Sequence, residues 1–135
     1  MKTREVKDLS KVHALISDLF QYPAEAQDWE PYRLSREQVE FFNEHGYVSG
    51  IKILDTRQVD ILNKELEALF DPTHPGNDLF YEYHSSESSD PDKVLFHALG
   101  AWRIAPGFHD VLWNPAFLMA ASQLLGDCSV RFWHD

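Results

Sequence analysis

The histidines and carboxylates are the residues of this sequence that could serve a metal centre, because the chain holds seven histidines and 22 aspartates and glutamates. A non-haem iron site needs two histidines and one carboxylate around the ion, with open positions for oxygen and substrate. Residues two apart on a strand share a face, so a His-x-Asp or His-x-Glu pair is the expected spacing. None of the seven histidines has an acidic residue two positions later. The spacing therefore argues against an iron site within this sequence.

Two histidines are directly followed by an aspartate, as His109-Asp110 and His134-Asp135. Neighbours on a strand point to opposite faces, so His134 and Asp135 are badly placed to hold one ion. His109 and Asp110 fall in a predicted helical turn and are placed no better. The sequence also has no glycine-rich phosphate loop, no Gly-x-Ser-x-Gly elbow and no Cys–His pair with an orienting group. We interpret each histidine as hydrogen-bonded or solvent-edge, and we predict neither a metal site nor a catalytic residue in this chain.

Length and composition indicate one soluble globular domain. The 135 residues are 44% hydrophobic and 25% charged, as in a typical single domain. Twelve lysines and arginines against 22 acidic residues give a formal net charge of −10, which repels nucleic-acid phosphates. Without a signal-peptide segment or an apolar run that could span a membrane, we expect a cytoplasmic protein with no membrane or nucleic-acid partner. The single cysteine, Cys128, excludes an internal disulfide, and we expect it to pack as a small apolar side chain at a strand start.

The N-terminal part is expected to be a helix followed by an irregular segment. Apolar residues at three- and four-residue spacing predict an amphipathic helix over about 7–20, ended by Pro23. Residues 21–33 show no clear period, and their aromatic and proline content indicates an irregular segment held by burial of Trp29 and Tyr32.

Two reciprocal capping pairs mark the next two helices. Ser35 with Gln38 predicts a helix start, and Gly46 supplies the left-handed residue that closes the helix. Asp55 with Gln58 repeats the signal and predicts a second helix that ends near residue 71.

The middle of the chain is less regular. Residues 47–53 have the β-branched and aromatic content of a short strand, bulged at Gly50. Residues 71–93 are rich in Pro, Ser, Asp and Gly and indicate a long surface loop, either a packed lid or a solvated linker. Residues 93–104 fit helix or strand, and the apolar spacing favours a helix.

The C-terminal part predicts a short helical turn over 108–113 and then a well-marked helix. Asn114 as cap, Pro115 at the first position and Gly126 after the end bracket that helix. Residues 128–135 alternate with a period of two and predict a strand. A lone strand with unpaired edges indicates an incomplete sheet, so we expect the sequence to stop in mid-sheet.

The order of several motifs is similar to one enzyme family. The first is Leu34-Ser35-x-x-Gln38-Val39-Glu40-Phe41-Phe42-x-x-His45-Gly46-Tyr47-Val48. It is followed by Leu62-x-x-Glu65-Leu66-Glu67-Ala68-Leu69, then by Trp113-Asn114-Pro115, Leu124-Leu125-Gly126-Asp127 and Val130-Arg131-Phe132-Trp133-His134-Asp135. Over about 34–135 the sequence resembles the N-terminal portion of the phytanoyl-CoA dioxygenase family of Fe(II)- and 2-oxoglutarate-dependent oxygenases.

The resemblance implies an α+β fold in which N-terminal helices wrap a double-stranded β-helix, or jelly roll. Residues 1–33 would be a lead-in, and 34–135 the N-terminal half of the domain, mostly helical and truncated before the iron-binding barrel. The family's His-x-Asp, its distal histidine and its 2-oxoglutarate arginine would all lie beyond Asp135, so this chain would carry none of the iron ligands.

Two residues match positions to which the family gives a role. Lys93 matches a lysine ahead of the barrel that helps to hold the 2-oxoglutarate carboxylate, and an ammonium group suits a carboxylate. A solvated surface lysine is the alternative. His134 falls where relatives place an inward side chain near the substrate.

The resemblance therefore implies an oxygenase that hydroxylates a small organic substrate with Fe(II) and 2-oxoglutarate, with this chain inactive alone. The alternative is a non-catalytic truncated fragment, or an interaction module that pairs through its exposed strand and self-associates. A metal-binding regulator that uses the scattered histidines is disfavoured by their spacing.

Overall fold

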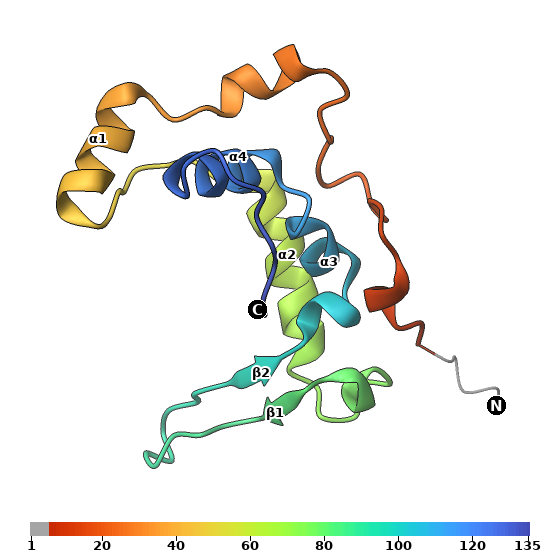
Figure 1. Cartoon of the computed structure of the whole chain (residues 1–135). Coiled ribbons are helices and arrows are strands. Elements are labelled where there is room, and N and C mark those ends of the chain that lie inside the picture. The colour runs from red at the N-terminus through yellow and green to blue at the C-terminus, as the bar shows by residue number, and fades with distance from the viewer. Residues whose placement is uncertain (1–5) are drawn as a thin grey trace.

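The computed structural model describes residues 6–135, and within them the chain is a small α+β structure (Figure 1). Its α-helices are α1 (Arg36–His45), α2 (Thr56–Leu69), α3 (Pro106–Val111) and α4 (Pro115–Leu124). Strands β1 (Glu82–His84) and β2 (His97–Leu99) pair antiparallel, and this two-stranded sheet does not close. Short 3₁₀ helices cover Leu9–Lys11, Ala26–Tyr32, Asn77–Leu79 and Ala101–Arg103. The α+β prediction is thus confirmed, while a jelly roll is not part of what these residues form.

Helices α1 and α2 begin where the capping pairs predict. The Ser35 hydroxyl accepts from the Gln38 amide at 3.2 Å, and the Gln38 side chain accepts from the Ser35 amide at 2.9 Å. Asp55 and Gln58 form the same reciprocal pair at 2.8 and 2.9 Å. Gly46 closes α1 in the left-handed conformation with φ +78°. These signals act within a few residues of one another, so the sequence alone sets them.

Helix α4 is capped as predicted, and its cap also joins two parts of the chain. The Asn114 side-chain oxygen accepts from the Ala116 amide at 2.9 Å, and Pro115 occupies the first helical position. Asn114 Nδ2 donates to the Ile53 carbonyl at 3.0 Å, and the residue is 2% exposed. Gly126 follows the helix with φ +79°.

The predicted helix over 7–20 is wrong, because only Leu9–Lys11 is helical. The remainder runs along the outside of the molecule beside α3 (Figure 1). The amides of Ile16 and Ser17 donate to the Asp110 carboxylate, at 2.9 and 2.7 Å. A helix would use those amides internally, so contacts to a distant buried carboxylate override the local apolar spacing.

Two further predictions of secondary structure are wrong, and a third holds only in part. Residues 47–53 form no strand, and 71–93, predicted as a loop, contains Asn77–Leu79 and β1. The favoured helix over 93–104 is wrong, since this segment supplies β2 and the turn Ala101–Arg103. Gly100 lies between them with φ +107°, and a Cβ there would approach the Tyr81 backbone nitrogen to 3.2 Å. That backbone conformation interrupts a right-handed helix and suits glycine.

The predicted strand over 128–135 is wrong, because these residues pair with no strand and form none. Its end is held instead by Asp135, whose carboxylate accepts from the amides of Gly100 at 2.7 Å and Trp102 at 3.1 Å. Cys128 is exposed, which contradicts the expected packing role.

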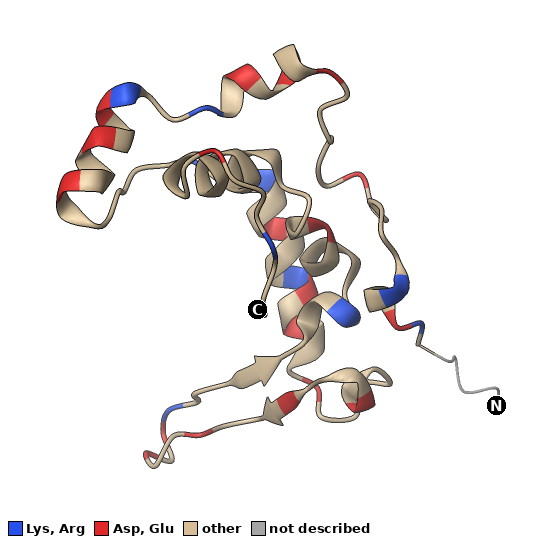
Figure 2. Cartoon of the chain, in the orientation of Figure 1, with Lys and Arg blue, Asp and Glu red and all other residues tan. Residues whose placement is uncertain are grey.

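The core is small and lies where α2 meets the turn before α3. Leu69, Ala101, Ile104 and Ala105 form its buried cluster. Acidic residues are spread over most elements and do not gather on one face (Figure 2). No helix in residues 6–135 combines the length and apolarity needed to cross a membrane.

Candidate functional site

A cavity lies between the N-terminal segment, α3, α4 and the C-terminal segment. Its volume is about 920 Å³, which is in the range of small-molecule sites. Three tryptophans, Trp29, Trp102 and Trp113, contribute to its wall, together with Tyr22 and Phe132. Aromatic walls of this kind offer large apolar area with a few polar handles.

Edge-to-face contacts join the aromatic residues of the wall across the chain. Tyr22 lies 5.2 Å from Trp29 and 5.7 Å from Trp113, measured between ring centroids. On the other side, Trp102 and Phe132 are 5.5 Å apart. The cavity therefore depends on four segments that are distant in sequence, which is why no local pattern predicts it. The sequence predicts burial of Trp29 and Tyr32; both are half-buried, and of the two only Trp29 lines this cavity.

Polar groups on this wall could orient a bound molecule. Arg131 and His13 both line the cavity, and Arg131 is exposed. The indole nitrogen of Trp102 is a buried donor with no hydrogen-bond partner in the described part of the chain. An arginine favours a ligand that presents anionic oxygen atoms.

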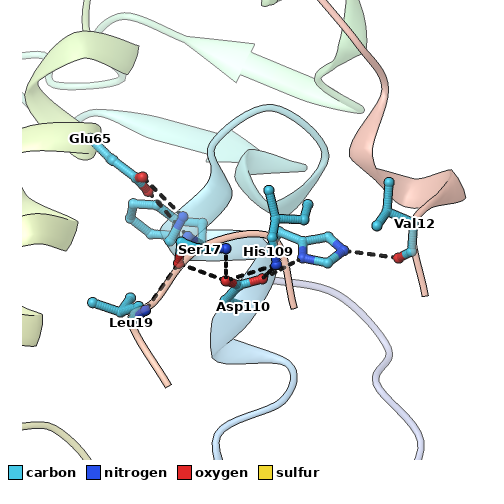
Figure 3. Close-up of polar contacts among 9 residues, drawn as sticks. Val12, Ser17, Leu19, Glu65, His109 and Asp110 are labelled. Atoms are coloured by element: carbon cyan, nitrogen blue, oxygen red, sulfur yellow. Dashed lines mark hydrogen bonds and ion pairs between the residues drawn. The ribbon is translucent and has the colours of Figure 1, made fainter. Parts of the chain in front are cut away.

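A buried histidine–aspartate pair holds one wall in place (Figure 3). His109 Nδ1 lies 2.9 Å from Asp110 Oδ1, and His109 Nε2 lies 3.0 Å from the carbonyl oxygen of Val12. The two side chains are 1% and 0% exposed. Each ring nitrogen of His109 thus faces an acceptor, the Asp110 carboxylate on one side and the Val12 carbonyl on the other. The interpretation of His109 as a hydrogen-bonded histidine is confirmed.

The Asp110 carboxylate is the centre of this pair. It accepts from the amides of Ile16 and Ser17 and from the Ser17 hydroxyl, the last at 2.6 Å. Burial by itself raises the pKa of Asp110, but the hydrogen bonds from Ser17, His109 and the two amides outweigh it and lower the pKa below its ordinary value. The carboxylate is therefore charged and fastens the N-terminal segment to α3.

Glu65 makes a similar contact from α2. Its carboxylate accepts from the amides of Gly107 at 2.9 Å and Phe108 at 3.2 Å, at the start of α3. An added Cβ at Gly107 would lie 2.7 Å from a Glu65 oxygen, so a larger residue there would require the Glu65 side chain to shift. Helix α3, which carries His109, is thus held from two sides (Figure 3).

The two residues predicted from the resemblance lie apart from each other and from the cavity wall. Lys93 is in the connection between β1 and β2, with its ammonium group 3.0 Å from Asp90 and most of its side chain in solvent. The hydrogen bond from Lys93 lowers the pKa of Asp90. His134 is exposed, and its Nδ1 contacts the Asp135 carbonyl at 3.1 Å. Neither prediction is tested by this placement.

The adjacent His134 and Asp135 do not face one common point. The Asp135 side chain is turned to the amides of Gly100 and Trp102 and so is not available beside His134. Among residues 6–135, no three His, Cys, Asp or Glu side chains are already placed to hold a metal ion.

Comparison with known proteins assigns no family. No protein-family model matches the sequence, and no curated protein matches it significantly. The resemblance to phytanoyl-CoA dioxygenases thus stays a prediction.

Proposed function

We propose that this chain is the helical part of a 2-oxoglutarate oxygenase of the phytanoyl-CoA dioxygenase type, that it binds a small organic substrate, and that it does not itself hold the iron. The observation that carries the proposal is the aromatic cavity of about 920 Å³ beside the C-terminal segment. In the family that the sequence resembles, the segment matching 130–135 leads into the barrel. A substrate surface at this place would adjoin the catalytic part.

The cavity's chemistry supports a ligand with an aromatic or aliphatic body and an anionic or carbonyl end. Rings of Trp102 and Phe132 would cover the body, while Arg131 would meet the oxygen atoms. The contribution of this chain would be to bind and orient the substrate.

Titration with anilinonaphthalene sulfonate tests the cavity, since this fluorescent probe has an aromatic body and an anionic group. We expect one saturable site. Phe132→Ala should weaken binding roughly three- to tenfold through loss of an aromatic contact. Arg131→Gln should weaken it up to about fivefold, as for a solvent-exposed ion pair.

The matched control is Trp133→Ala, because Trp133 neighbours both residues but is 88% exposed. This variant should bind like the unmodified chain. Equal affinity in all variants, or no saturation, would overturn the assignment of the cavity. In parallel, chelator-sensitive decarboxylation of 2-oxoglutarate by the 135-residue chain with added Fe(II) would contradict the statement that it does not hold the iron.

A second candidate is an interaction module that pairs through its sheet edges. The observation in its favour is the two-stranded sheet, whose outer edges have no partner strand in the described residues. Its connecting loop also exposes apolar side chains, with Val94 78% and Leu95 57% exposed. Such edges and patches favour strand addition.

Sedimentation equilibrium separates the two candidates. The interaction module predicts concentration-dependent dimers that are weakened by Val94→Lys together with Leu95→Lys. A monomer over the whole concentration range would remove this candidate and leave the cavity proposal untouched.

A further inference from the structure

The β-hairpin gathers two histidines and two glutamates that no spacing rule in the sequence identifies. His84 and His97 are direct partners in the register of β1 and β2, and their ring centroids are 5.6 Å apart. Glu82 is two residues before His84 on the same strand and shares its face. Glu87 enters from the connecting loop. The hairpin register alone brings together His84 and His97, which are distant in sequence.

The carboxylates face the ring nitrogens directly. Glu87 Oε2 lies 2.9 Å from His97 Nδ1, and Glu87 Oε1 lies 3.9 Å from His84 Nε2. Glu82 Oε1 lies 3.1 Å from the same His84 nitrogen. Every ring nitrogen in these contacts is therefore opposed by a carboxylate oxygen, and Glu87 reaches both rings.

The loop that carries Glu87 is held close to the strands. The Glu87 amide donates to the Leu95 carbonyl at 2.8 Å, and the Leu95 amide donates to the Ser86 hydroxyl at 3.4 Å. These bonds fix the backbone, and the Glu87 side chain is 39% exposed.

We propose that His84, His97 and Glu87, assisted by Glu82, form a binding site for a divalent transition-metal ion of the Zn²⁺ type. Imidazole nitrogens and carboxylate oxygens are the ligands that Zn²⁺ takes in proteins, and tetrahedral Zn²⁺ sets neighbouring ligand atoms about 3.3–3.5 Å apart. The observed N–O separations of 2.9, 3.1 and 3.9 Å bracket that value. In the structure as it stands the four side chains form hydrogen-bonded pairs and do not surround one point. The proposed site therefore requires the Glu87 and Glu82 side chains to rotate out of these pairs when the ion binds.

Local charge favours a cation at this place. Between Glu82 and His97 the sequence has four acidic residues, Glu82, Glu87, Asp90 and Asp92, and one basic residue, Lys93 (Figure 2). Lys93 is paired with Asp90 at 3.0 Å, so a cation at the histidines meets a net negative surrounding. The hairpin residues involved do not line the aromatic cavity, and this site is independent of the proposed oxygenase function.

Calorimetric titration of the tag-free chain with ZnCl₂ near neutral pH tests the proposal. We expect one ion per chain. His84→Ala and His97→Ala should each weaken binding by about tenfold or more, since loss of even an outer-shell partner of a metal ligand has an effect of that size. Glu87→Gln should weaken it in the same direction. Co²⁺ as a second probe should give a visible absorption band that is lost in these variants.

The control is His45→Ala, which removes another exposed histidine beside an acid, Glu44, at 3.8 Å on α1. Zn²⁺ affinity should not change in this variant. Circular dichroism of each variant reports whether the hairpin substitutions leave the fold intact, which their exposed positions favour. Absence of Zn²⁺ binding, or equal binding by the His84→Ala/His97→Ala double variant, would overturn the proposal.

Discussion

Replacement of Asp110 by alanine is expected to release the N-terminal segment from α3. The carboxylate accepts four hydrogen bonds, from the Ile16 amide, the Ser17 amide and hydroxyl, and His109. His109 is 1% exposed, so its Nδ1 would lose its acceptor in a buried place, while its Nε2 keeps the contact with the Val12 carbonyl at 3.0 Å. An unsatisfied buried donor costs about 1–3 kcal/mol, and the lost charge-assisted bonds bring the total to about 3–5 kcal/mol.

Urea unfolding followed by tryptophan fluorescence measures this loss, and amide hydrogen exchange at Ile16 and Ser17 locates it. Asp110→Asn is the matched variant, since it keeps the shape and one acceptor oxygen and should cost about 1–3 kcal/mol. A loss below about 1 kcal/mol for Asp110→Ala, with unchanged exchange at both amides, would refute the assignment of this carboxylate as the fastening point.

Three further predictions concern stability. The hydrogen bond from Arg103 lowers the pKa of Asp8 well below its ordinary range. The charged Asp8 therefore stabilises the fold at pH values above the pKa of an unfolded aspartate, about 3.9. This stabilisation is lost as the pH falls through the pKa of Asp8 in the folded protein. At pH values below about 4, the urea concentration at half-unfolding should therefore fall as the pH is lowered, and it should fall less steeply in Asp8→Asn. An equal dependence on pH in both proteins would contradict this. Asn114→Ala should cost about 1–3 kcal/mol in urea unfolding, because the cap of α4 and the bond to Ile53 are lost together; a near-neutral result would argue against the double role. Gly100→Ala should lower the free energy of unfolding by about 1–2 kcal/mol, because φ is +107° at this position. An unchanged melting temperature would show that the backbone at position 100 can adopt another conformation.

The sequence predicts those features that depend on neighbours within a few residues. Ser35 with Gln38, Asp55 with Gln58, and Asn114 with Pro115 each satisfy helix ends locally, so α1, α2 and α4 begin where expected.

Features that depend on distant partners could not be predicted in this way. The apolar spacing of residues 7–20 is helical, yet Asp110 takes the amides that a helix would use. The apolar pattern around residues 97–99 fits the period of a helix and that of a strand, and only pairing with β1 makes them a strand. The same holds for the cavity and the hairpin cluster, whose members meet through tertiary contacts and the strand register.

The nucleotide sequence of the transcript on the 3′ side of the Asp135 codon tests the proposed function most directly. The proposal predicts an open reading frame that soon encodes a His-x-Asp motif and, later, a further histidine and an arginine, as the resemblance implies. A stop codon directly after Asp135, or a continuing frame without a His-x-Asp motif, would contradict it.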